Sequence, residues 1–323
     1  MKPGQTTVQR EATLPGSTDG RAGQTLPDEP LAGLGRRQKS SLMAMGPTLS
    51  ERYQISERIA AGGSAEIFLA TDRLTGGAVA VKRLRPTLTT EPTARARLRR
   101  EAKLLRQLSH DGIPELHEEL PAACALIMEL LPGQPLARLL GGKSPLDTTL
   151  VRQIMQGLLA VLSFLHDRAV VHRDIKPGNI MVLQETRESV AVKLLDFGLA
   201  ASLRGGGREA DLTRSGVPMG TPLYMSPEHC RGRGIGTAAD VYSLGAVLYE
   251  MLSGRPPHCA ATPVEILAAH LTQTPAPICT VVSDPQRASL AEMAMAALAK
   301  EPKERPLASE LLARLRRLTE PPP

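Results

Sequence analysis

The chain has 323 residues, of which 42% are hydrophobic and 22% are charged. This length and apolar content suffice for one large or two medium domains with proper cores, and they exclude a chain that is disordered throughout. The net charge of +6 would allow binding to nucleic acid or a membrane surface, but Lys and Arg are interleaved with Asp and Glu along most of the chain, which favours an ordinary solvated surface and no nucleic-acid partner.

The cysteines stand far apart and form no C-x-x-C pair, so they predict neither a disulfide framework nor a zinc site. They are Cys124, Cys230, Cys259 and Cys279. Such spacing fits a reducing compartment, and we expect a cytoplasmic protein. No uninterrupted apolar run approaches the roughly 18 residues that span a bilayer, and the first residues lack the apolar segment of a signal peptide, so no membrane span is expected.

Residues 1–50 mix Gly, Pro, Thr, Gln and scattered charges without helical or strand periodicity. Such a segment cannot bury enough apolar surface to fold, which predicts a disordered tail. The folded domain is expected to begin near Tyr53, because Tyr53–Ile59 alternates apolar and polar residues like a half-buried strand. A turn over Ala60–Ala65 leads into a second strand at Glu66–Ala70, and the small residues of this turn let a ligand approach the backbone closely.

The third expected strand, Ala78–Lys82, is apolar until its last residue. An unpaired ammonium group is costly to bury, so Lys82 needs an anionic partner unless its side chain reaches the surface. Glu101 is the candidate partner. It lies in Ala94–Leu108, where leucines recur at helical spacing, and we expect a helix that carries Glu101 toward Lys82.

Two further strands, Glu115–Glu118 and Ala123–Met128, would complete a small sheet. Glu129–Gly133 interrupts the strand pattern, so the chain is expected to leave the sheet there. The next segment, Thr148–His166, has apolar residues at helical spacing, and Asp147 is its expected N-cap.

The stretch His172–Asn179 combines an acid, two cations and an amide directly after the apolar residues 169–171. A polar turn is the alternative, because Asp, Pro, Gly and Asn are turn formers. Asp174 can accept a proton, Lys176 can place a positive charge beside it, and Asn179 offers an amide oxygen to a hard cation such as Mg²⁺. Together these groups indicate phosphoryl transfer.

This stretch resembles the catalytic loop of protein kinases, H-R-D-x-K-P-x-N. The resemblance implies that Asp174 orients and deprotonates a substrate hydroxyl and that Lys176 offsets charge on the transferred group. It also implies that Lys82, paired with Glu101, contacts the α- and β-phosphates of ATP. Asn179 would hold a metal ion.

Two strands, Ile180–Val182 and Ala191–Leu195, are expected to form a hairpin that leads into Asp196, Phe197 and Gly198. A simple strand exit is the alternative. The position of this tripeptide after the catalytic loop resembles the kinase D-F-G motif, which implies that Asp196 binds a metal ion opposite Asn179. The implied cofactors are ATP and Mg²⁺, with Mn²⁺ as an alternative metal.

By the same resemblance, a further set of residues would surround ATP. Met128 would be the gatekeeper behind the adenine, backbone groups of Glu129 and Leu131 would bond its edge, and Met181 would form its floor. The loop departs from the pattern G-x-G-x-x-G, whose first and third glycines are Ala60 and Ala65 here. The complete expected set is Ile59, Ala60, Gly62, Gly63, Ile67, Ala80, Lys82, Met128, Glu129, Leu131 and Met181.

The segment Leu199–Met219 carries charges and three consecutive glycines without periodicity, and it resembles an activation loop. Thr213 and Ser215 stand where bacterial relatives carry phosphorylated threonines. A phosphate there could pair with Arg173 and order the loop. The alternative is that Arg173 bonds local carbonyls in a loop ordered without modification.

Residues Gly220–Glu228 resemble the G-T-x-x-Y-x-x-P-E stretch of serine/threonine kinases, with Ser226 in place of alanine in A-P-E. Thr221 together with Lys176 is the serine/threonine signature, so the resemblance implies specificity for aliphatic hydroxyls.

The segment Thr237–Leu252 is apolar almost all round, which predicts a buried helix that Gly254 ends. Asp240 at its start could accept hydrogen bonds from the backbone of His172 and Arg173, although an ordinary helix cap is the alternative.

Three more helices are expected, at Val264–Leu271, Arg287–Leu298 and Ala308–Leu318. Before the last, residues 302–306 match the family pattern P-x-x-R-P. The resemblance implies a salt bridge between Arg305 and Glu228.

We therefore expect an α+β, bilobal protein kinase-like fold at 53–318, with a small β-rich lobe at about 53–129, a large helical lobe at about 133–318, and a tail at 319–323. The resemblance is strongest to bacterial serine/threonine protein kinases. It implies transfer of the ATP γ-phosphate to Ser/Thr hydroxyls of proteins, with autophosphorylation of the activation loop. The oligomeric state is left open, and a transient dimer is one route to this autophosphorylation.

Two other function classes compete with this one. A pseudokinase scaffold would share the fold, but scaffolds usually lose the Lys, the HRD Asp or the DFG Asp, and Lys82, Asp174 and Asp196 are all present. A small-molecule phosphotransferase shares the Asp and Asn loop but has no use for Thr221 or the S-P-E element.

Overall fold

The computed structural model describes residues 47–184, 186, 189–202, 222–278 and 284–318. Every described residue belongs to one compact unit, Ala44–Pro323. The expected tails at 1–46 and 319–323, and the candidate residues Thr213, Ser215 and Thr221, lie outside the described residues.

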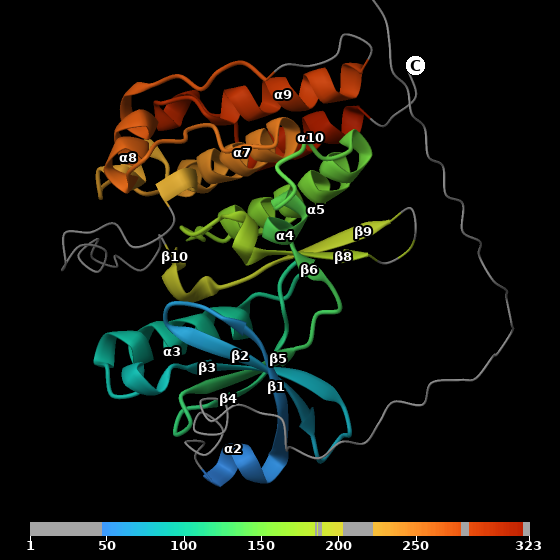
Figure 1. Ribbon diagram of the computed structural model, residues 1–323, viewed down its shortest axis with the longest axis vertical. Helices are drawn as coiled ribbons and strands as arrows, with labels where there is room; N and C mark the ends of the chain where they lie inside the picture. The colour runs from blue at the N-terminus through green and yellow to red at the C-terminus, as the bar shows by residue number, and fades with distance from the viewer. Residues whose placement is uncertain (1–46, 185, 187–188, 203–221, 279–283, 319–323) are drawn as a thin grey trace, which may run out of the picture. The chain divides into compact units, whose positions relative to one another are not determined.

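A five-stranded antiparallel sheet forms the first part of this unit, which we call the N-lobe (Figure 1). Its strand order is β1-β2-β3-β5-β4, and one long helix, α3, lies beside it in the same figure. The bounds are β1 Tyr53–Ala61, β2 Ala65–Asp72, β3 Ala78–Leu84, β4 Leu116–Leu120, β5 Ala125–Glu129 and α3 Pro92–Gln107, with a short 3-10 turn at Pro86–Leu88.

The two faces of β3 have different neighbours because successive side chains of a strand point to opposite sides. Val79 and Val81 are buried in an apolar cluster on one face of the sheet. Leu84 lies on the other face and packs in a cluster with Leu98 of α3. Lys82 shares that second face, so the strand directs it toward α3.

The N-lobe begins earlier than the sequence predicts, because a short helix, α2, spans Pro47–Arg52. Leu49 has no exposed surface and packs in the same cluster as Val81. Arg52 lies 2.8 Å from a carboxylate oxygen of Asp72 and 2.8 Å from one of Glu118. The prediction of a disordered tail up to residue 50 is therefore wrong for 47–50, since the buried Leu49 and the ion-paired Arg52 hold this short helix to the sheet.

The second part, the C-lobe, is mainly helical and contains two small sheets. One sheet has the order β6-β8-β9 and the other pairs β7 with β10. The helices are α4 Leu136–Leu140, α5 Thr148–Asp167, α6 Pro227–Cys230, α7 Thr237–Ser253, α8 Pro263–Thr272, α9 Pro285–Ala297 and α10 Ala308–Arg317. The strands are β6 Gln134–Pro135, β7 Val170–Val171, β8 Ile180–Gln184, β9 Val190–Leu194 and β10 Ala201–Ser202, and 3-10 turns occupy Pro177–Asn179, Phe197–Leu199, Pro222–Tyr224 and Pro302–Glu304.

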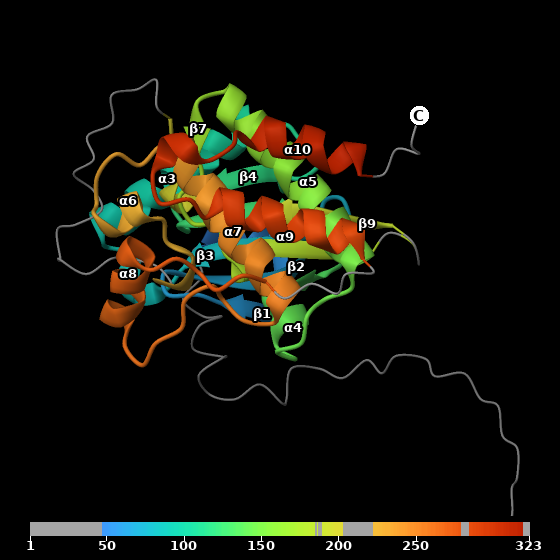
Figure 2. The same ribbon diagram turned by 90° about the horizontal axis from the view of Figure 1, so that it is seen from above.

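The C-lobe core lies between α5, α7, α9 and α10, which are seen from above in Figure 2. Helix α7 contacts α9 closely, because a Cβ added at Gly245 would lie only 2.7 Å from the Cβ of Ala297. Helix α5 approaches β9 in the same way, since a Cβ at Gly157 would lie 2.4 Å from Val192 Cγ2. Glycine at these two positions lets the elements that carry the site pack tightly.

Helix α5 is the one described helix that is long and apolar enough, by length and composition alone, to cross a membrane. This is weak evidence, because core helices pass the same test. Leu158, Leu159 and Leu162 have no exposed surface and belong to the C-lobe core, so α5 has the burial of a core helix.

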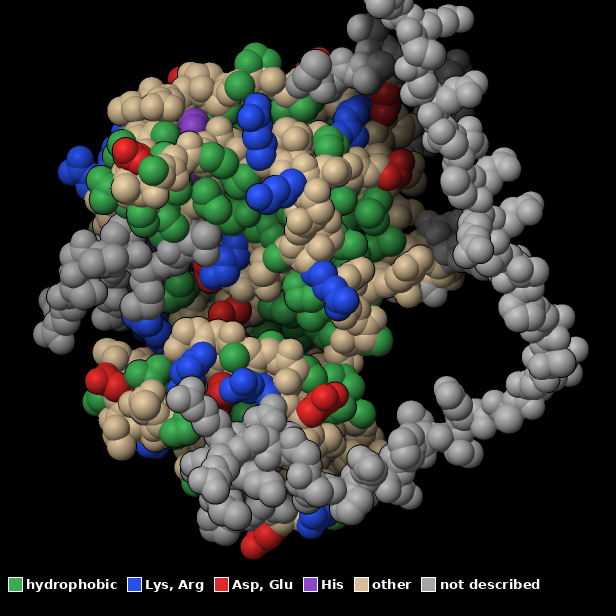
Figure 3. Space-filling model, viewed as in Figure 1, with side chains coloured by type: hydrophobic (Ala, Val, Ile, Leu, Met, Phe, Trp, Pro, Cys, Tyr) green, Lys and Arg blue, Asp and Glu red, His purple; other side chains and the backbone are tan. Residues whose placement is uncertain are grey.

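Each predicted strand and helix is observed, with ends that agree to within a few residues, and the expected α+β, bilobal arrangement is confirmed. Asp147 caps α5 by accepting hydrogen bonds from the backbone N–H groups of Thr149 and Leu150, as predicted. Gly254 has φ of +77° and ends α7, as predicted. On the face drawn in Figure 3, Lys and Arg side chains are scattered and form no single basic patch, in keeping with the interleaved charges of the sequence.

Candidate active site

The expected pair of Lys82 and Glu101 is present. Lys82 Nζ on β3 lies 2.6 Å from Glu101 Oε1 and 2.7 Å from Oε2 on α3. It also lies 3.0 Å from Asp196 Oδ1, which comes from the C-lobe. Burial acts to lower the pKa of Lys82, but the charges of Glu101 and Asp196 outweigh burial, so the pKa is raised and the ammonium group stays protonated.

The catalytic-loop candidates Asp174, Lys176 and Asn179 also meet. Lys176 Nζ lies 3.0 Å and 2.7 Å from the two carboxylate oxygens of Asp174. Asn179 Nδ2 donates to Asp174 Oδ2 at 2.8 Å and to the Asp174 carbonyl at 2.8 Å. These bonds fix the orientation of the Asp174 carboxylate.

Asp240 at the start of α7 holds the backbone of this loop, as predicted. It is buried and accepts the N–H of His172 at 2.8 Å and the N–H of Arg173 at 2.9 Å. His166 Nε2 of α5 lies 3.1 Å from the same carboxylate. Arg173 has φ of +68°, a left-handed conformation that is unfavourable for a residue with a Cβ, and the bond to Asp240 stabilises it.

Asp196 follows β9 in a left-handed conformation with φ of +64°. Burial acts to raise the pKa of its carboxyl, but the charge and hydrogen bond of Lys82 prevail, and the pKa is lowered. His172 Nε2 bonds the Leu195 carbonyl at 3.0 Å, and its ring meets Phe197 edge-on. The segment that carries Asp196 is thereby tied to the catalytic loop.

Asn179 and Asp196 fit a divalent metal ion by their chemistry. The Asn179 amide nitrogen donates to Asp174, which leaves its amide oxygen as an acceptor, and Asp196 is an ionised carboxylate. Mg²⁺ prefers such oxygen ligands and usually takes one or two from the protein and the rest from phosphates and water. The described residues contain no group of three or more His, Cys, Asp or Glu side chains that could hold a metal ion.

The expected ATP contacts of the N-lobe lie on neighbouring strands. Ala60 of β1 pairs with Ile67 of β2, which in turn pairs with Lys82 of β3. Ala80 of β3 pairs with Met128 of β5. Paired residues share a face of the sheet, so these side chains form two adjacent rows on the α3 side.

The remaining expected contacts border this face. Ile59 is 48% exposed on β1, and a Cβ added at Gly63 in the next turn would meet nothing within 4 Å, so the turn leaves room for a ligand. Gly62 lies in the same turn as Gly63, and Met181 lies on β8. Glu129 ends β5 and begins the hinge, which we define as Glu129–Gly133 and which also contains Leu131. No described contact tests their roles, which remain predictions.

The predicted salt bridge between Arg305 and Glu228 is confirmed. The two guanidinium nitrogens lie 2.6 Å and 2.8 Å from the carboxylate oxygens, and the Arg305 side chain has no exposed surface. Arg305 also donates to the carbonyls of Ala238, Ala299 and Lys300. The pair joins α6 to the segment before α10.

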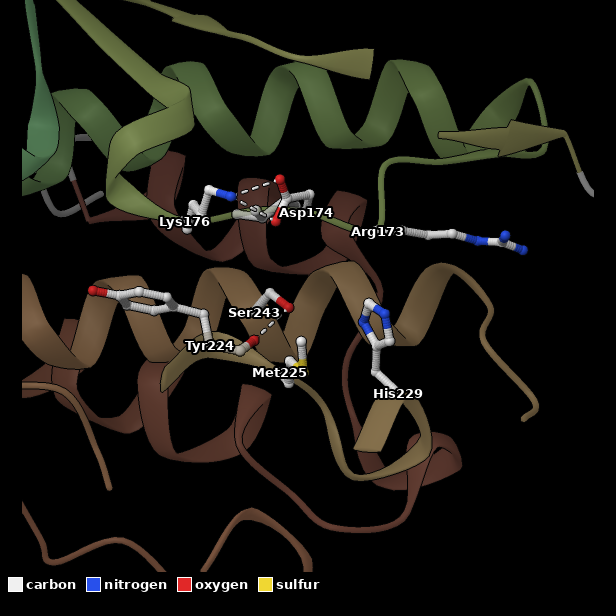
Figure 4. Close-up of a pocket in the computed structure, with 8 residues that line it drawn as sticks. Arg173, Asp174, Lys176, Tyr224, Met225, His229 and Ser243 are labelled. Carbon is white, nitrogen blue, oxygen red and sulfur yellow. Dashed lines mark hydrogen bonds and ion pairs between the residues drawn. The ribbon is translucent and has the colours of Figure 1, made fainter. Parts of the chain in front are cut away.

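A pocket lies between the catalytic loop and the segment around α6 (Figure 4). Arg173, Asp174, Ile175 and Lys176 line it from one side, and Tyr224, Met225, His229 and Ser243 line it from the other. In Figure 4 the Arg173 side chain extends away from the bonded pair of Lys176 and Asp174. Sequence reasoning missed the second wall, although the position of Tyr224, Met225 and His229 in and beside the G-T-x-x-Y-x-x-P-E pattern was a usable signal.

Residues 53–315 match the family described as the protein kinase domain. The chain belongs to the protein kinase family. Members of this family use ATP and a divalent metal ion. The match covers both lobes and every site residue described above.

Bacterial serine/threonine-protein kinases are among the curated relatives of this chain. The chain is 35% identical over 283 residues to serine/threonine-protein kinase PknB of Mycobacterium tuberculosis, an alignment that covers 85% of this chain and 44% of that protein. It is 34% identical over 270 residues to serine/threonine-protein kinase pkn3 of Myxococcus xanthus, with 82% and 49% covered. A probable PknB of Bifidobacterium longum is 37% identical over 237 residues, with 70% and 34% covered. The chain thus spans less than half the length of these relatives.

Replacing Arg305 by Ala should destabilise the kinase domain strongly, because it leaves the Glu228 carboxylate buried without its partner. We expect the free energy of unfolding to fall by about 3–5 kcal/mol. Arg314→Ala is the matched control, since Arg314 pairs with Glu292 at the surface and its loss should cost about 0–1 kcal/mol. Chemical denaturation of both variants measures the difference. Equal stability of the two would show that the buried pair contributes no more than an exposed one.

Proposed function

We propose that this chain is a serine/threonine protein kinase that transfers the γ-phosphate of ATP to Ser or Thr hydroxyls of proteins. The observation that carries the proposal is the arrangement around Asp174. Its carboxylate is oriented by Lys176 and Asn179, and it faces a pocket whose other wall is the Tyr224–Met225 segment. A Ser or Thr side chain presented at the mouth of this pocket would bring its hydroxyl to Asp174.

Phosphoryl transfer depends mainly on positioning and on stabilising charge. Lys82, held by Glu101, would bind the α- and β-phosphates, and Asn179 and Asp196 would hold Mg²⁺, with Mn²⁺ as a substitute. When bound, the metal ion would neutralise part of the negative charge of the phosphates. The protein groups then align the γ-phosphorus with the substrate oxygen.

In the transfer step, the substrate oxygen forms a bond to the γ-phosphorus while the bond from that phosphorus to the β,γ-bridging oxygen breaks. Asp174 accepts the hydroxyl proton, and ADP leaves with the bridging oxygen. Lys176 is bonded to Asp174 and offsets the negative charge that passes between the two oxygens. Two groups of one short loop therefore serve both the proton and the phosphoryl group.

A pseudokinase scaffold of the same fold is the alternative function. Such a scaffold has no need for a phosphate-binding lysine, a base and two metal-binding groups in contact with one another. Here Lys82 contacts Glu101 and Asp196, and Asp174 contacts Asn179. These contacts favour the enzyme.

We also propose the cytoplasm as the place of action. Cys124, Cys230 and Cys259 are free thiols, in keeping with the reducing compartment that their spacing suggested.

Asp174→Asn and Lys82→Met should each reduce phosphoryl transfer at least about a hundredfold, because they remove the base and the phosphate-positioning cation. The measurement is transfer of labelled phosphate from Mg-ATP to a generic basic protein, followed by phosphoamino acid analysis. We expect phosphoserine and phosphothreonine with the wild-type chain. A thermal melt serves as the folding control. Near-normal transfer by folded Asp174→Asn would contradict the role of Asp174, and equal inactivity of wild type and variants would favour the scaffold.

The activity should depend on phosphorylation of Thr213 or Ser215, both of which lie outside the described residues. Arg173 adjoins the base, and a phosphate with a charge of about −1.5 to −2 is a strong partner for a guanidinium group. Mass spectrometry of protein produced with and without a phosphatase should locate the phosphate. The double variant Thr213→Ala/Ser215→Ala should be at least about tenfold less active. Full activity of that unphosphorylated variant would refute the switch.

A further inference from the structure

Lys193 is a second lysine that interrupts an apolar strand, and the proposed mechanism does not use it. It lies in β9, between Val192 and Leu194, and its side chain is 14% exposed. Its ammonium group bonds Glu129 Oε2 at 2.6 Å and the Ile113 carbonyl at 3.3 Å. A single C-lobe cation therefore contacts two different N-lobe segments.

One of these segments is the hinge, where Glu129 ends β5. The Glu129 carboxylate also accepts the N–H of Glu115 at 3.2 Å, and the Glu129 N–H donates to the Glu115 carbonyl at 3.0 Å. The carboxylate and the backbone N–H of this residue are thus both engaged. A backbone group of this residue is expected to bond the adenine edge.

The other segment is the connection between α3 and β4, at Gly112–Ile113. The Leu194 N–H donates to the Gly112 carbonyl at 2.8 Å, and a Cβ added at Gly112 would lie only 2.1 Å from Val161 Cγ2 of α5. This connection is therefore packed against the C-lobe, although it belongs to the N-lobe by sequence.

We propose that Lys193 is a positioning residue for nucleotide binding, because it ties this connection to the hinge and holds both against β9. We call the three bonded groups, Lys193 Nζ, Glu129 Oε2 and the Ile113 carbonyl, the Lys193 latch. The latch fixes the Glu129 peptide and the opening between the lobes in the state where Lys82 already contacts Glu101. The inference rests on the proposed function, since it takes ATP or ADP as the ligand of this hinge.

The ordinary interpretation of Lys193 and Glu129 is a surface ion pair, and such pairs contribute little to the stability of a protein. Two features argue against it. The ammonium group is largely shielded from solvent, and its two acceptors lie on separate segments. Without the latch the hinge would occupy the binding-competent arrangement for only part of the time, and the apparent Kd rises as that fraction falls.

The test is the affinity of the full chain for ADP in the presence of Mg²⁺, measured by calorimetry, because ADP binding requires no phosphoryl transfer. Lys193→Met keeps the apolar stem and removes the charge, and we expect Kd to rise about five- to tenfold. Lys193→Arg should restore Kd to within about twofold, since a guanidinium group can reach the same acceptors. Turnover at saturating ATP should change less than about twofold, because no latch group touches the reacting atoms.

Two controls isolate the latch. Lys103→Met makes the same exchange at an exposed lysine of α3 and should leave Kd unchanged. In a chain that already carries Glu129→Gln, Lys193→Met should raise Kd less than it does in the wild-type chain, because the contact with the Glu129 carboxylate is already weakened and the bond to the Ile113 carbonyl is the one left to lose. Thermal melts of all variants check that they are folded.

Unchanged or tighter ADP binding by folded Lys193→Met would overturn the inference, and so would faster turnover, which would mean that the latch restrains the lobes. A wild-type chain that binds no ADP would remove both the inference and the proposed function. A wild-type chain that binds ADP but transfers no phosphate would contradict the proposed function alone.

Discussion

The arrangement of the site depends on the carboxylate of Asp240. It is 1% exposed, and it accepts the backbone N–H groups of His172 and Arg173 at 2.8 and 2.9 Å. A left-handed conformation at a residue such as Arg173 costs about 1–2 kcal/mol, and a buried, charge-assisted bond is of the right size to offset it. Asp174 is the next residue, so the direction in which the proposed base points follows from this bond.

From Asp174 a continuous series of contacts leads into the other lobe. Asn179 bonds Asp174 through its side chain, and its backbone carbonyl accepts the N–H of Leu195. Asp196 follows and contacts Lys82, which in turn contacts Glu101. The Asp196 carboxylate of the C-lobe therefore helps to orient the Lys82 ammonium group of the N-lobe. The Lys193 latch would act in parallel, at the hinge and without touching this series.

Sequence reasoning succeeded where a charged residue stands in an apolar setting within a recognisable pattern. Lys82, Asp240 and Arg305 each need a buried partner. Family patterns indicated the partners of Lys82 and Arg305, the position at a helix start indicated those of Asp240, and the structure contains all of these contacts. It failed at α2, because one buried leucine in a short helix leaves no periodicity to detect. It also passed over Lys193, whose need for an anion was as visible as that of Lys82 but whose acceptors belong to no motif and come together only through the packing of α5 and β9.

Substitution of Asp240 by Asn tests the central claim most directly, because it nearly preserves shape while replacing one carboxylate oxygen by an NH₂ donor that faces a backbone N–H. The measurement is kcat for protein phosphorylation together with Kd for ADP in the same folded preparation. If Asp240 positions the base, kcat should fall at least about tenfold while Kd for ADP stays within about twofold. An unchanged kcat in the folded variant would show that the catalytic loop keeps its conformation without this carboxylate, and would contradict the account.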